Sequence, residues 1–283
     1  MTAYCCSLFP SSTPLTLGER IQQYWTQRAA SFRQVRQREL HSDKPERWWA
    51  EIAPHLPARK RGEPLRVLDV GTGAGFLAIL FARQGCEVTA VDSCAQMLRE
   101  AEHLSRNEAL RIDFRQMDAD SLQFANDSFD CVVARNVMWT LVAPCAAYRE
   151  WWRVLRQGGR LLNFDANYGA VDFTDPAHAG SQHAHANIDP ELLREGERIR
   201  QALPLSHEDR PRWDMSTLEE IGFSRCACDQ EISGRIFATR DASFNPVPMF
   251  VLSAVKPLPR SVEGSINDYT ISTINTNEPY KFT

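Results

Sequence analysis

The stretch VLDVGTGAGF, from Val67 to Phe76, joins an apolar run to a loop with glycine at every second position. The apolar run predicts a buried strand, and a glycine-rich turn after such a strand usually holds a nucleotide. The dinucleotide-binding pattern G-x-G-x-x-G does not fit, because the third glycine comes one position early. The loop also lacks the Gly-Lys-Ser/Thr of a P-loop, so it offers no lysine for a triphosphate.

Acidic residues end this predicted strand and the next one. Asp69 lies two residues before Gly71, where a carboxylate would repel a pyrophosphate and would suit a cationic group. Asp92 ends the next predicted strand, 21 residues after Gly71. The carboxylate of Asp69 therefore favours a ligand with a cationic group over a pyrophosphate.

Strands and helices alternate around this loop. Strands are predicted at 66–70, 87–92, 111–117, 129–134 and 160–165, and two more at 223–232 and 249–256. Helices of the α/β repeat are predicted at 75–84, after Ser93 and at 144–156. Such alternation indicates a parallel sheet with helices on both faces, and the last two strands predict an antiparallel hairpin. We expect a doubly wound α/β fold: a seven-stranded, mostly parallel sheet in three layers (αβα).

Local signals predict where several helices begin and end. Ser93 can act as the N-cap of the helix that follows it. The glycine pair at 158–159 would end the helix 144–156 in a left-handed cap. Capping-box spacing at 216–219 predicts a short helix that ends at Gly222.

The chain divides into four expected segments, one of which contains an insertion. Residues 1–16 are expected to be flexible, and 17–61 to form a helical lid. The α/β domain would span 62–257, with an insertion at 166–213 that caps the substrate site. Residues 258–283 form a polar tail.

Composition excludes some classes of partner. The 283 residues carry a net charge of −4, so nothing attracts the chain as a whole to nucleic acid or to an anionic membrane. No apolar run reaches the roughly 18 residues of a membrane span, and the N-terminus lacks the features of a signal peptide. The eight scattered cysteines fit a reducing, cytoplasmic compartment. The pair Cys226 and Cys228 has no second pair at zinc spacing, so we interpret it as structural.

Together, Asp69 and the three glycines form D-x-G-x-G-x-G, which resembles motif I of the class I, Rossmann-like S-adenosylmethionine-dependent methyltransferases. The resemblance covers about residues 20–170. QMDAD contains the Asp-Ala pair of the family's fourth strand, FDCVVARNVMWTL looks like motif IV, and VLRQGGRLL looks like the entry into strand five.

The resemblance implies that S-adenosylmethionine is the cofactor and assigns residues to it. These cofactor residues are Tyr24, Arg28, Asp69, Gly71, Gly73, Gly75, Asp92, Ser93, Met97, Asp118, Ala119, Arg135 and Asn136. Asp69 would orient the ammonium group, Asp92 the ribose, and Asp118 the adenine amino group. Tyr24 and Arg28, one helical turn apart, would face the cofactor carboxylate.

The other assigned residues would shape the walls around the cofactor. The three glycines let the backbone approach the methionine moiety and adenosine. Ser93 or Met97 would pack on the adenine, and Ala119 would offer its backbone N–H to the ring. Arg135 and Asn136 would lie at the methionine end. Trp139 or Tyr168 could stabilise the sulfonium, although Trp139 fits a core position equally well.

Candidates for a general base lie after the fifth strand of the repeat. His178, His183 and His185 fall within the loop DPAHAGSQHAHAN, where His183 and His185 could deprotonate an acceptor. These histidines could also ligate a metal, or simply face solvent in a polar loop. Asp165 is a second candidate base, and hydrogen bonding to the next loop is its alternative role. We assign no metal ligand.

We expect the chain to methylate an O, N or S atom of a small-molecule metabolite. The tetrapeptide D/N-P-P-[YFW] of amino-group methyltransferases is absent, since 134–137 read ARNV. The expected partners are therefore a small acceptor, with no nucleic acid and no membrane, and the chain would be a monomer or a homodimer. Two alternatives remain: a cofactor-binding protein with sensing or non-methyl transfer, and a metal-binding accessory protein that uses the histidine loop.

Overall fold

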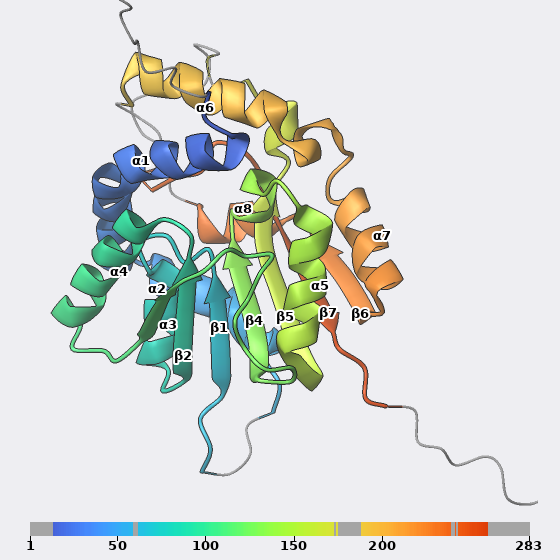
Figure 1. Ribbon diagram of the computed structural model, residues 1–283. Helices are drawn as coiled ribbons and strands as arrows, with labels where there is room; N and C mark the ends of the chain where they lie inside the picture. The colour runs from blue at the N-terminus through green and yellow to red at the C-terminus, as the bar shows by residue number, and fades with distance from the viewer. Residues whose placement is uncertain are drawn as a thin grey trace, which may run out of the picture.

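The computed structural model describes residues 14–58, 62–172, 174, 188–238, 241 and 243–259. A seven-stranded sheet forms the centre of the molecule, in the order β3-β2-β1-β4-β5-β7-β6 (Figure 1). The strands are β1 Arg66–Val70, β2 Glu87–Asp92, β3 Asp113–Gln116, β4 Phe129–Arg135, β5 Leu155–Ala166, β6 Ser224–Asp229 and β7 Met249–Val255. The helices are α1 Leu17–Leu40, α2 Lys44–Ile52, α3 Phe76–Arg83, α4 Ala95–Asn107, α5 Pro144–Val154, α6 Pro190–Ala202, α7 Arg212–Ile221 and α8 Ile232–Ile236. The predicted α/β fold class is confirmed.

The sheet has two parts that differ in strand direction. The strands β1 to β5 are parallel, and β7 lies antiparallel to both β5 and β6, as the predicted hairpin requires. The chain leaves β1 toward one edge of the sheet and crosses back to β4 on the other side. A crevice therefore forms at the carboxyl ends of β1 and β4, which is where sheets of this kind bind ligands.

Apolar residues of the parallel strands alternate between two cores. Val67 packs in the core that includes α2, α3 and α8, whereas Leu68 packs in the core that includes α5 and α7. Both side chains are fully buried. This alternation is what a parallel strand covered on both faces requires.

Two helices cover the carboxyl edge of the sheet. Figure 1 shows α1 and α6 lying across the ends toward which the parallel strands point. A capping box between Thr16 and Glu19 starts α1. Arg20 of α1 forms an ion pair with Glu195 of α6 at 2.8 Å. A Cβ atom at Gly196 would lie 3.0 Å from the Tyr24 ring, so glycine allows close packing of the two helices.

The predicted end of the helix before β5 is wrong. The helix ends at Val154, and Gly158 and Gly159 lie inside β5. A Cβ atom at Gly159 would come within 2.6 Å of the Arg156 carbonyl oxygen. The register between β4 and β5 also shifts between Phe129 and Cys131. The glycine pair therefore serves an irregular start of the strand and not a helix cap.

Two other predicted helix starts are also wrong. The N-cap of α4 is Cys94, and Ser93 lies before it. Helix α7 begins at Arg212, so Ser216 is in its interior and no capping box forms there. The strand predicted at 223–232 is shorter, because the backbone turns into α8 at Ile232.

Several predictions concern residues outside the described ranges. They include His178, His183 and His185, residues 1–13, residues 59–61 of the expected lid and most of the tail. Within the described part of the chain, no helix is long and apolar enough to cross a membrane. The segment boundaries expected from the sequence stay predictions.

Candidate functional site

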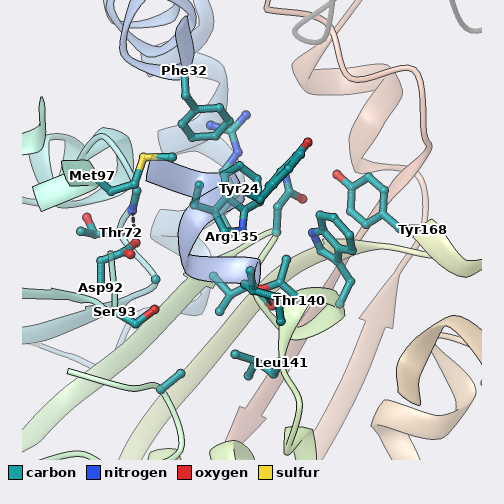
Figure 2. Close-up of a pocket in the computed structure, with 18 of the residues that line it drawn as sticks. Tyr24, Phe32, Thr72, Asp92, Ser93, Met97, Arg135, Thr140, Leu141 and Tyr168 are labelled. Carbon is teal, nitrogen blue, oxygen red and sulfur yellow. Dashed lines mark hydrogen bonds between the residues drawn. The ribbon is translucent and has the colours of Figure 1, made fainter. Parts of the chain in front are cut away.

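A cavity of about 550 Å³ opens at the carboxyl edge of the sheet, between the strand ends and α1. Of the thirteen predicted cofactor residues, all but Arg28 and Gly75 line it. Figure 2 shows Asp92 and Ser93 on one side of this cavity and Tyr168 on the other, with Tyr24, Phe32 and Arg135 between them. The structure thus brings together residues from α1, β1, β2, β4 and the loops that follow these strands.

The glycine loop depends on the absence of side chains. Gly71, Gly73 and Gly75 have φ angles of 62°, 53° and 85°, in the left-handed region that L residues avoid. A Cβ atom at Gly71 would lie only 2.4 Å from a methyl carbon of Val137. Gly75 packs against Ala101 of α4 instead of lining the cavity, which explains its absence from the wall.

Asp69 holds the glycine loop in place. Its Oδ2 accepts hydrogen bonds from the Thr72 hydroxyl at 2.6 Å and from the Ala78 backbone N–H at 3.0 Å. The residue is 1% exposed. Burial raises the pKa of this carboxyl to about 7, because the hydrogen bonds offset only part of the cost of burying the charge.

Asp92 links the loop to the start of α4. Its Oδ2 accepts from the Gly73 N–H and its Oδ1 from the Cys94 N–H, both at 2.9 Å. Burial raises the pKa of Asp92 to about 6. Two backbone donors fix the plane of the carboxylate, and the residue lines the cavity.

Arg28 is a buried cation without a described anionic partner. The residue is 2% exposed, and its Nε and Nη1 atoms have no hydrogen-bond partner among the described residues. Its guanidinium carbon lies 6.0 Å from the centre of the Tyr24 ring. Burial lowers the pKa of Arg28, and the interaction with Tyr24 opposes this change. Leaving such a charge unpaired is costly, so the arrangement suits an anionic ligand group next to Tyr24.

Asn136 is a second residue with an unpaired buried atom. Its backbone adopts a φ of 57°, and its N–H donates to the Phe164 carbonyl oxygen at 2.8 Å. The side-chain Oδ1 atom is buried and has no partner in the described residues. A side chain of the cavity wall with a free acceptor suits a ligand that donates a hydrogen bond.

Arg135 lines the cavity but is already paired. Its Nη1 and Nη2 atoms donate to the two carboxylate oxygens of Glu39 at 3.1 and 3.0 Å. Arg36 also pairs with Glu39, and the Trp48 Nε1–H donates to it at 2.9 Å. Glu39, Arg36 and Trp48 were not among the predicted site residues. For Arg36 and Glu39, a basic and an acidic residue three positions apart on the apolar face of α1 were a usable signal.

Aromatic side chains form the wall opposite Asp92. The rings of Trp139 and Tyr168 lie 4.8 Å apart, and Trp25 of α1 approaches Trp139 at 6.5 Å. The Tyr168 hydroxyl accepts a hydrogen bond from the Asn245 amide at 2.9 Å. The rings of Trp25, Trp139 and Tyr168 present an aromatic surface, which suits a cation or a flat ligand.

Asp165 does not line this cavity. It is fully buried and pairs with Arg210 at 3.1 Å, while the same guanidinium binds Asp214 at 2.8 Å. Burial raises the pKa of Asp165, and Arg210 opposes this change. The position matches the alternative role, a bond to a later loop, better than that of a base. Among the described residues, no cluster of three metal-ligating side chains occurs.

Comparisons with known proteins agree with this geometry. Residues 68–163 match the model of a methyltransferase domain family. The uncharacterized methyltransferase YcgJ of Bacillus subtilis is 30% identical over 156 residues, which cover 53% of this chain and 60% of that protein. The ubiquinone/menaquinone biosynthesis C-methyltransferase UbiE of Bdellovibrio bacteriovorus is 38% identical over 117 residues, 40% of this chain and 48% of that protein.

The fold also matches solved structures. A phosphoethanolamine N-methyltransferase of Haemonchus contortus, solved in complex with S-adenosylmethionine, superposes with a TM-score of 0.59 at 17% identity, over 88% of this chain and 62% of that one. The matched regions span only about half to 60% of the curated relatives. Residues 68–163, which hold the glycine loop and its acidic partners, are therefore similar to a methyltransferase domain.

Proposed function

We propose that this chain transfers the methyl group of S-adenosylmethionine to a small-molecule acceptor. The observation that carries the proposal is the convergence of eleven predicted cofactor residues on one cavity. One of them, Tyr24, interacts with Arg28, a buried guanidinium whose Nε and Nη1 atoms have no hydrogen-bond partner among the described residues. Such a cavity, with a few convergent polar groups and shifted pKa values, is typical of a ligand site.

The residues present fit the parts of the cofactor. Asp92 would accept the ribose hydroxyls, and Asp118 and Ala119 would contact the adenine. Arg28 and Tyr24 would bind the carboxylate, and Asp69 would attract the ammonium group. When bound, S-adenosylmethionine supplies a methyl group on a sulfonium, which is already activated for transfer.

The remaining task of the chain is to align the acceptor and exclude water. Helices α1 and α6 cover the cavity, and their Arg20–Glu195 ion pair holds them together. Trp139 and Tyr168 would position the acceptor and stabilise the positive charge at sulfur.

The proposal includes the acceptor atom and the general base that would deprotonate the acceptor. We propose O, N or S as the acceptor atom. Because the relative UbiE is named a C-methyltransferase, methylation of a carbon atom is a further outcome that the product analysis should test. That relative's name, in quinone biosynthesis, supports a small acceptor. His183 and His185 are the proposed bases where the acceptor needs one, since Asp165 is held by Arg210. We further propose a cytoplasmic monomer or homodimer without nucleic-acid or membrane partners.

Two measurements in series test the proposal. Calorimetric titration with S-adenosylmethionine and S-adenosylhomocysteine should give one site of micromolar affinity. Mass spectrometry after incubation with a metabolite extract should then reveal a product heavier by one methylene. Binding without such a product would favour sensing or a different transfer, and absence of binding would refute the assignment of the glycine loop.

A further inference from the structure

Three buried charges lie together beside the cavity, where α1 meets the end of β4, and the two arginines among them line it. The carboxylate of Glu39 pairs with the guanidinium groups of both Arg36 and Arg135. The side chains of the two arginines are 6% and 8% exposed, and that of Glu39 is not exposed at all. One carboxylate cannot neutralise two guanidinium groups, so this triad carries an excess positive charge where little water can solvate it.

No other described acid removes this excess. Asp69 is within the electrostatic reach of Arg135, but burial raises the pKa of Asp69 to about 7, so the carboxyl is only partly ionised at neutral pH. Burial and then the neighbouring Arg36 lower the pKa of Arg135 to about 10. Among the described residues, the Nε atom of Arg135 is buried without a hydrogen-bond partner. The triad therefore favours an anion supplied by a ligand.

The cofactor alone does not account for this charge. S-adenosylmethionine has one carboxylate, which the proposed function assigns to Arg28 and Tyr24. Its ammonium and sulfonium groups are cations, which an arginine repels. The positive charge of the triad is therefore left for a second ligand in the same cavity, and Arg36 and Arg135 both line that cavity.

The triad borders the aromatic end of the cavity. Burial raises the pKa of the Tyr168 hydroxyl, and the nearby charges of Arg135 and Arg36 oppose this change. Tyr168 in turn packs on Trp139. Figure 2 shows Tyr168 on the side of the cavity away from Asp92 and Ser93, which are assigned to the ribose end. Arg135 lies between these two ends, so the excess charge borders the space between the ribose end and the aromatic wall.

We propose that the methyl acceptor is an anion whose carboxylate or phosphate group is bound by Arg36, while its flat body lies against Trp139 and Tyr168. The inference rests on the proposed methyl transfer for the role of the ligand, but the anion site itself is independent of that role. Arg135 supports it through its charge, since both of its terminal nitrogens are held by Glu39.

Calorimetry with three small probes tests this site on the full chain saturated with S-adenosylhomocysteine. Benzoate and phenyl phosphate supply the two anionic groups, and benzamide is a neutral analogue of benzoate with nearly the same shape. At least one of the two anions should bind tenfold or more tightly than benzamide, and the tighter one identifies the anionic group. Equal affinities, or no binding of either anion, would overturn the proposal.

Variants on α1 assign the effect to one side chain. Arg36→Gln should weaken binding of the anionic probe about 10- to 100-fold, the range for a charged hydrogen bond, and Arg36→Lys should retain much of it. Arg38→Gln removes the same charge from an exposed position of the same helix and should change nothing. Thermal melting of each variant checks that it is folded.

The titrations distinguish a failure of the anion-site proposal from a failure of the proposed function. If Arg36→Gln weakens S-adenosylhomocysteine as much as it weakens the anionic probe, Arg36 serves the cofactor and the inference is wrong. If the protein binds no S-adenosylhomocysteine, the proposed function fails. The same probe titrations on the free protein then still decide whether Arg36 forms an anion site.

Discussion

Replacing Asp69 by asparagine should stabilise the free protein above pH 7 and weaken its binding of S-adenosylmethionine. The folded-state pKa of Asp69 is raised from 3.8 to about 7, so the folded protein prefers the protonated carboxyl. The corresponding stability is present below pH 4 and is lost as the pH rises through about 7. Three pKa units at 1.36 kcal/mol each make this loss about 4 kcal/mol when complete.

Asparagine keeps the loop and removes the charge. Its amide oxygen can still accept the hydrogen bonds from Thr72 and Ala78, while its buried NH2 group costs about 1–3 kcal/mol if it finds no acceptor. The net gain at pH 8 is therefore about 1–3 kcal/mol. Affinity for S-adenosylhomocysteine should fall about 10- to 100-fold, because the charge that attracts the ammonium group is gone.

Urea unfolding of both proteins at several pH values measures this effect. The free energy of unfolding of Asp69→Asn minus that of the wild type should grow by about 3 kcal/mol between pH 5 and pH 8. Other groups that titrate, such as Asp92, are present in both proteins, so their contributions cancel in this difference. A difference that stays constant with pH would show that Asp69 is ionised without cost. Unchanged affinity for S-adenosylhomocysteine would refute its role at the ammonium group.

Three further outcomes are expected. Arg28→Gln should weaken S-adenosylhomocysteine about 10- to 100-fold in calorimetry without lowering the melting temperature, because the lost charge is unpaired in the free protein; a lower melting temperature with intact affinity would contradict this. Gly71→Ala should lower the free energy of unfolding in urea by about 2–5 kcal/mol, because the backbone there is left-handed and the new Cβ atom clashes with Val137. Adding Val137→Ala should restore part of this stability, and no restoration would exclude the clash. Cofactor should protect α1 from limited proteolysis, and equal cleavage with and without it would remove α1 from the proposed lid.

The parts of the site that the sequence predicts are those set by local spacing. The glycines at 71 and 73 need only their own φ angles and the strand before them. Asp92 and Asp118 end or follow neighbouring parallel strands, so the topology brings them to one edge once the alternation is recognised. Both of these acids line the cavity as expected.

The parts that the sequence does not predict depend on contacts between distant residues. Glu39 and Arg135 are 96 positions apart, and only the folded chain brings them together. Asp165 resembles a free base until Arg210, 45 positions later, is seen to pair with it. Gly158 and Gly159 look like a helix end, because the irregular pairing of β4 with β5 is not visible in the local sequence.

The central claim is that the cavity beside the glycine loop binds S-adenosylmethionine through its ribose and carboxylate. One calorimetric comparison tests it most directly: S-adenosylhomocysteine titrated into the wild type and into Asp92→Asn, which keeps the size of the side chain. We predict a single site of micromolar affinity that weakens about 10- to 100-fold in the variant, since a charged acceptor is lost. No binding to the wild type, or equal binding to both proteins, would contradict the account.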